Sequence, residues 1–127
     1  MSRFFLGAGA ILAGLAVLLG AFAAHTLEGR VTPERLQVFE TGARYQMYHA
    51  LALLFLSWAC VQWPVWQVNW AGYLFIAGVV VFSGSLYTLV LTDTPWLGAM
   101  TPFGGLSLIA GWLLLAWAAL KVPSSPF

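Results

Sequence analysis

Two histidines are the residues of this chain best suited to chemistry. His25 lies near the end of the first long apolar stretch, and His49 lies about a turn and a half inside the second. Both side chains are therefore expected near the same end of two neighbouring helices. A pair of imidazoles with Glu28 or Asp93 nearby binds a transition metal, relays protons or ligates haem where the distances suit. We favour the alternative that each histidine bonds a backbone carbonyl or tyrosine hydroxyl and fixes helix packing, so no cofactor and no metal is predicted.

An arginine and two tyrosines form a second polar group. Arg44 begins the second apolar stretch, and Tyr48 follows it by one turn. Tyr45 precedes His49 by one turn, so two polar stripes lie on adjacent faces of one helix. A guanidinium at this depth can hold a lipid phosphate or another anion through two hydrogen bonds, and Gln46 would complete such a site.

The structural alternative for Arg44 is an ion pair. Its side chain would extend to water and pair with Glu40 or Asp93, while the tyrosines mark the membrane interface. We favour this pairing, but the anion site stays open. The candidates for binding a lipid headgroup or anion are therefore Arg44, Tyr45, Tyr48, His25, His49 and Asp93.

The composition shows which solvent surrounds the protein. Hydrophobic residues make up 61% of the chain and charged residues 7%, whereas soluble domains carry about 25% charged residues. A soluble fold would expose large apolar patches and aggregate, so a bilayer must cover them. The net charge of +1 provides no basic stripe, which excludes nucleic acid as a partner. The lone Cys60 excludes an intrachain disulfide and a multi-thiolate metal site.

Four apolar stretches have the length of a membrane span. Each is close to the ~20 residues that an α-helix needs to cross the hydrocarbon layer, and helices are required because lipid offers no partner for backbone polar groups. The breaks at Trp63-Pro64 and Thr94-Pro95 agree with these limits. The sequence therefore predicts an all-α fold, with a single integral membrane domain over residues 1–127 and four transmembrane helices in a compact bundle. The predicted spans are residues 4–27, 45–63, 70–91 and 103–120.

The connection between the first two spans predicts a helix of its own. Residues 32–34, Thr-Pro-Glu, combine an N-cap, a proline at the first helical position and an acid in the first turn. Leu36 and Phe39 then provide one apolar face that could rest on the membrane surface. Gly42 is the expected bend into the second span. We therefore predict a short amphipathic interfacial helix between spans one and two.

An even number of spans places both termini on one side of the bilayer. The connections after the first and third spans then share the opposite side. Only Arg3 and Lys121 lie on the terminal side, so the distribution of positive charge does not determine the absolute orientation. Seven of the nine charged residues lie together on the other side, namely Glu28, Arg30, Glu34, Arg35, Glu40, Arg44 and Asp93.

Small residues recur at positions that suit close contact between helices. Membrane helices approach one another where Gly, Ala, Ser or Thr face the neighbour. These contacts can lie within one chain or between copies, and the serines could alternatively line a polar path. The packing candidates are Ala16, Gly20 and Ala24 in the first span, Ser83, Gly84 and Ser85 in the third, and Ser107 and Gly111 in the fourth.

Five segments in chain order resemble the signature of a widespread membrane-protein family, that of domain of unknown function 423, which includes the bacterial YgdD proteins. The most specific string is Tyr-Gln-Met-Tyr-His at residues 45–49, and Ala23 departs from a position that is often glycine. The resemblance implies a four-span protein of the bacterial cytoplasmic membrane, and it implies no activity, cofactor or catalytic residue. The matching segments are residues 20–25, 40–51, 82–87, 101–105 and 111–112.

No arrangement of nucleophile and base, or of paired carboxylates, is apparent in the sequence, so we expect no enzyme. The leading hypothesis is a membrane binding or accessory protein that engages a lipid headgroup, a small anion or a protein partner at its polar side. A small oligomeric transporter or channel is the alternative, although the four spans contain no Asp or Glu. Metal or haem binding by His25 and His49 is the third. The expected partners are membrane lipids, with a protein partner or a second copy of the chain as further candidates.

Overall fold

The computed structural model describes residues 1–123, and it confirms the all-α prediction. Each long helix includes most or all of one apolar stretch, and the second long helix begins well before its stretch. Of the two short elements, one ends the first apolar stretch, and the other lies in the third connection, where proline interrupts the apolar sequence. The elements are α1 (Ser2–Phe22), the π-helix η1 (Ala23–Leu27), α2 (Pro33–Gln62), α3 (Trp66–Thr92), the 3-10 helix η2 (Pro95–Ala99) and α4 (Thr101–Lys121).

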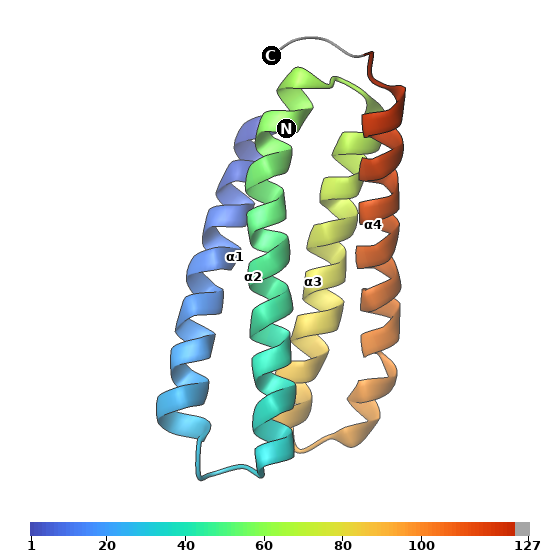
Figure 1. The fold of residues 1–127 in the computed structure, drawn as a ribbon. Coiled ribbons are helices and arrows are strands. Elements are labelled where there is room, and N and C mark those ends of the chain that lie inside the picture. Colours follow the sequence, from blue (N-terminus) through green and yellow to red (C-terminus); the bar gives the residue numbers. More distant parts are fainter. Residues whose placement is uncertain (124–127) are drawn as a thin grey trace.

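The four long helices lie side by side and alternate in direction (Figure 1). The α2–α3 turn lies at the same end as the N-terminus and the end of α4, whereas the α1–α2 and α3–α4 connections lie together at the other end (Figure 1). We call this other end, formed by residues 28–32 and 93–100, the polar end. Most of the charged residues therefore lie at or near it, as the even helix count predicts.

Three helical segments are long and apolar enough to cross a membrane: Ser2–Leu27, Trp66–Thr92 and Pro95–Lys121. They correspond to the first, third and fourth predicted spans. Helix α2 is not among them, because its first half carries the charged and polar residues that follow Thr32.

The prediction of a separate interfacial helix is wrong. The helix begins as predicted, with Thr32 Oγ1 accepting a hydrogen bond from Arg35 N at 3.2 Å, but it continues without a break to Gln62. Gly42 is not a bend. It is buried where α3 approaches, so that a Cβ there would lie 2.8 Å from Tyr87 Cε1. Phe39 is fully buried, because α1 and α3 cover the apolar face that was expected to rest on the membrane surface.

The predicted compact bundle is not supported either. The extensive contacts join α1 to α2, α2 to α3 and α3 to α4, so α1 and α4 form the two edges of the assembly. The larger core cluster fills the half near the termini and includes Phe5, Leu53, Phe75 and Leu108. A smaller cluster near the polar end includes Phe39 with residues of η1 and α3.

Candidate functional site

His49 is buried in α2 with both ring nitrogens engaged. The indole Nε1–H of Trp112 in α4 donates to His49 Nε2 at 3.0 Å. Because an indole nitrogen can only donate, Nε2 accepts and the ring proton lies on Nδ1, which donates to the Tyr45 carbonyl at 2.7 Å. Phe75 meets the imidazole at 5.2 Å between ring centroids. His49 is therefore a neutral link between α2 and α4 with no nitrogen left for a metal.

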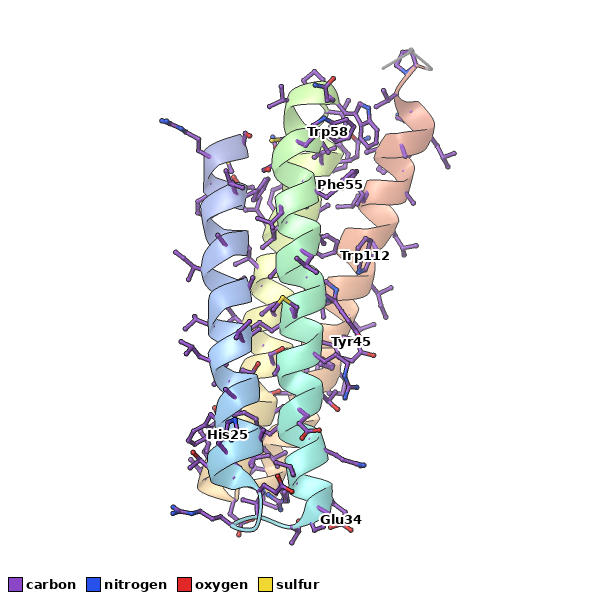
Figure 2. The ribbon with its side chains drawn as sticks, turned by 60° about the vertical axis from the view of Figure 1, so that its left-hand side comes forward. His25, Glu34, Tyr45, Phe55, Trp58 and Trp112 are labelled. Atoms are coloured by element: carbon purple, nitrogen blue, oxygen red, sulfur yellow. The ribbon has the colours of Figure 1, made fainter. Side chains whose placement is uncertain are left out.

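His25 lies far from His49. It is exposed on η1, near the polar end (Figure 2). Helices α1 and α2 are antiparallel, with Phe22 packed on Phe39 and Leu12 O bonded to Gln46. This register places the two histidines roughly 20 Å apart along the helix axes, at 1.5 Å per residue. Within residues 1–123 no group of three or more His, Cys, Asp or Glu side chains could hold a metal ion.

A second buried polar link joins three helices, and sequence reasoning missed it. Tyr87 OH in α3 donates to Gln46 Oε1 at 2.7 Å, and Gln46 Nε2 donates to Leu12 O in α1 at 2.8 Å. Gln46, predicted as part of the headgroup site, thus faces the interior and is only 3% exposed. Its spacing of three from His49 was the available signal, because residues three apart share a helix face.

The predicted packing serines all lie between helices. Ser83 Oγ donates to Gly42 O at 2.7 Å, and Ser107 Oγ donates to Leu74 O at 2.8 Å. Ser85 Oγ lies 2.6 Å from Thr101 Oγ1. These bonds tie α3 to α2 and to α4.

The remaining packing candidates divide into two groups. Gly111 lies against Phe75, where a Cβ would come within 2.7 Å of the ring, and Ala16 is buried. In contrast, a Cβ at Gly20 or Gly84 would meet no atom within 4 Å, and Ala24 is exposed. A small residue at these three positions is therefore not required by a close neighbour within the described chain.

Arg44, Tyr45 and Tyr48 lie together on the exposed side of α2. The tyrosine rings meet edge to face at 5.6 Å, and Tyr45 also packs on Phe82 of α3 at 5.0 Å. No hydrogen bond or ion pair of the Arg44 side chain occurs among residues 1–123, so the expected pair with Glu40 is not formed. The exposed guanidinium is free to meet a ligand.

A groove of about 330 Å³ has Tyr45 in its wall, whereas Arg44 and Tyr48 are not among its lining residues. It runs between α2 and α4, where Figure 2 shows Tyr45 and Trp112 on the side on which these helices face one another. Its walls are mostly apolar, and within the described residues the only hydrogen bond between two lining side chains is the one from Trp112 to His49. The lining residues are Tyr45, His49, Phe82, Gly105, Leu108, Ile109 and Trp112.

Asp93 belongs to a different place at the polar end. It ends α3 in the left-handed conformation, with φ 51°, and its Oδ1 accepts from Arg35 Nη1 at 3.1 Å. The same Nη1 donates to Leu89 O at 3.4 Å. The partner of Asp93 is thus Arg35 and not Arg44. The structure divides the predicted candidates among the groove beside Arg44, the Arg35–Asp93 pair and the separate His25.

Comparison with known proteins agrees with the apolar helices. A family model described as "Protein of unknown function (DUF423)" matches residues 19–105. A UPF0382 membrane protein of Staphylococcus aureus is 46% identical over 119 residues, which are 94% of this chain and 97% of the relative. The UPF0382 membrane protein YwdK of Bacillus subtilis is 47% identical over 120 residues, 94% of this chain and 98% of the relative. No solved structure matches the chain. The chain is therefore an integral membrane protein that belongs to the DUF423 family of proteins of unknown function.

Proposed function

We propose that this protein crosses the membrane four times, α2 included, and binds an anionic lipid through Arg44 and the adjoining groove between α2 and α4. Its role is that of a non-enzymatic binding or accessory protein. The single observation that carries the proposal is an exposed arginine without an acidic partner in the described chain, next in sequence to Tyr45, which lines a mostly apolar groove.

The low apolarity of α2 does not prevent it from spanning. Its 30 residues extend about 45 Å, more than the ~30 Å of hydrocarbon. It packs between α1 and α3, which both have the composition of spans. The polar groups that dilute its apolar sequence, Gln46 and His49, are buried and bonded to neighbouring helices. Their polar atoms are therefore already hydrogen-bonded within the protein and need no partner from lipid.

The depth of Arg44 suits contact with a phosphate. Its neighbour Tyr45 packs on Phe82, and Phe82 in turn contacts Gly104, so Arg44 lies about one turn inside the beginning of α4. A charge at the centre of a membrane helix costs about 2.5–3.5 kcal/mol on insertion scales, and a long side chain near a helix end reduces this cost by reaching the interface. A lipid phosphate at that level supplies the missing counter-charge and accepts two hydrogen bonds from the guanidinium.

The residues around Arg44 suit the rest of a lipid molecule. Tyr45 and Tyr48 are exposed beside it, and their hydroxyls can bond to headgroup oxygens. The groove continues from Tyr45 towards the centre of the protein along Leu108 and Ile109. Its aromatic and aliphatic walls match an acyl chain. Such a chain would cover apolar surface whose contact with water is unfavourable.

The other hypotheses have less support. Metal or haem binding would need a free nitrogen on His49, and both are engaged. Transport would need a polar path, whereas the buried Gln46 and Ser83 bond to neighbouring helices rather than to open space. Neither alternative has an observation of its own in its favour.

Native mass spectrometry of the detergent-solubilised protein tests the proposal. We expect adducts with phosphatidylglycerol in preference to phosphatidylcholine, and we expect Arg44→Gln to remove this preference. Arg3→Gln, at the opposite end, is the matched control and should keep it. An unchanged preference in Arg44→Gln, or no preference in the wild type, would refute the assignment of the headgroup to Arg44.

A further inference from the structure

A second cavity lies at the polar end, between the α1–α2 connection and the end of α3. Its volume is about 320 Å³. It joins two parts of the chain that are distant in sequence, residues 30–35 and residues 90–93. It is separate from the groove beside Arg44, because Arg35 precedes Arg44 by nine residues of α2, about 14 Å along the axis. The lining residues are Arg30, Val31, Thr32, Arg35, Val90 and Asp93.

The cavity carries both positive and negative side chains, and two acceptors hold Arg35 in place. Arg35 is held by Asp93 Oδ1 and by Leu89 O, both through Nη1. The Nε and Nη2 donors of Arg35 make no hydrogen bond within residues 1–123, and the side chain of Arg30 makes none either. The Asp93 side chain lines the cavity and is 85% exposed, and its second oxygen accepts no hydrogen bond within residues 1–123. Two guanidinium groups and one carboxylate give a formal charge of +1.

We propose that this cavity binds a small phosphorylated amine, with its phosphate on Arg30 and Arg35 and its ammonium on Asp93. A phosphate monoester carries about −1.5 to −2 charges at neutral pH, so a phosphate with one ammonium complements the net charge of the cavity. Guanidinium groups hold phosphate oxygens through paired hydrogen bonds. A simple oxyanion would meet the repulsion of Asp93, which an ammonium converts into attraction.

The uncharged walls fit the middle of such a ligand. Val31 and Val90 line the cavity and can contact a two-carbon linker between the charged groups. The Thr32 hydroxyl oxygen accepts from Arg35 N, so its hydrogen is available to a phosphate oxygen. A phosphate and an ammonium joined by two carbons occur in free O-phosphoethanolamine, whose phosphate is a monoester, and in the headgroup of phosphatidylethanolamine, whose phosphate is a diester with a single negative charge.

Calorimetric titration of the full-length protein in detergent tests the free molecule. We expect O-phosphoethanolamine to bind more tightly than inorganic phosphate or ethanolamine. Arg30→Gln should weaken it about tenfold or more, because a hydrogen bond to a charged group contributes about 1.5–3 kcal/mol and 1.4 kcal/mol is a factor of ten. Asp93→Asn should weaken the binding of O-phosphoethanolamine but not that of phosphate, because only the former has an ammonium for the carboxylate. The variant should keep the turn after α3, since asparagine tolerates the left-handed conformation. Arg3→Gln and Glu34→Gln are controls that should leave binding unchanged.

Native mass spectrometry from nanodiscs tests the lipid source. Retention of phosphatidylethanolamine over phosphatidylcholine, lost in Asp93→Asn, would support the headgroup as the ligand. Binding of the free molecule alone would support a water-soluble ligand. The proposal fails if neither form binds, or if Asp93→Asn leaves the binding of both unchanged. Because Arg44 is not part of this cavity and none of these variants alters it, failure of the lipid site at Arg44 would leave this result unaffected.

Discussion

Helices α3 and α4 approach one another closely at Gly104, and this contact can be tested by adding one methyl group. A Cβ at Gly104 would lie 2.8 Å from Phe82 Cα and 2.9 Å from Phe82 Cβ, and it would also overlap Phe82 N. These atoms belong to a helix backbone or are fixed to it, so no change of rotamer removes the overlap. Gly104→Ala must therefore push the two helices apart.

The neighbouring Gly105 provides the matched control. A Cβ there would meet only the Phe82 ring, at 3.8 Å, which is ordinary van der Waals contact. Both substitutions gain the same helix propensity, up to about 1 kcal/mol. The difference between Gly104→Ala and Gly105→Ala therefore isolates the steric cost, about 1–3 kcal/mol for overpacking. Gly105→Ala itself should be neutral or slightly stabilising.

The free energy of unfolding, measured by SDS titration in mixed micelles with tryptophan fluorescence as the signal, provides the comparison. Gly84→Ala, where a Cβ would meet nothing within 4 Å, is a second control in α3. We expect only Gly104→Ala to lower the free energy of unfolding. Equal stability of the Gly104 and Gly105 variants would refute the close backbone contact between α3 and α4 and with it the register that shapes the groove.

Three further predictions concern the buried hydrogen bonds, each measured by the same unfolding assay. Tyr87→Phe and Gln46→Leu should show a coupling of about 0.6–1.7 kcal/mol in a double-mutant cycle, as for hydrogen bonds in other membrane proteins, and additive effects would contradict their bond. Ser83→Ala should cost about 1 kcal/mol because its bond joins two helices, whereas Thr88→Ala, whose hydroxyl bonds within its own helix, should cost much less. Trp112→Phe should cost about 1–3 kcal/mol, because the buried histidine would lose its donor; an unchanged stability would disprove that bond.

The limits of the helices could be predicted well because their causes are local. The breaks at Trp63-Pro64 and at Thr94-Pro95 appear in the structure as the end of α2 and the beginning of η2, since proline acts on its own turn of the chain. The cap at Thr32 was equally readable. The length of the helix that begins after Thr32 could not be predicted in this way. Whether its helix stops at Gly42 or continues depends on α3, which packs on that glycine.

The candidate site was harder to predict because partners across helices depend on register. His25 and His49 have similar positions relative to their apolar stretches, yet the antiparallel register of α1 and α2 separates them. The sequence alone did not distinguish Arg44 from Arg35 as the partner of Asp93. In the structure Asp93 pairs with Arg35.

Composition, span length and the clustering of charge are properties of the chain alone, and they determined that this protein is all-α, lies in a membrane and gathers its charged residues near one end. The tertiary structure decided which polar side chains of α2 turn inward, which arginine keeps an acidic partner and which is left exposed beside a groove. These outcomes depend on contacts between residues that are far apart in the chain, such as Gly104 and Phe82. A local sequence pattern cannot predict such contacts.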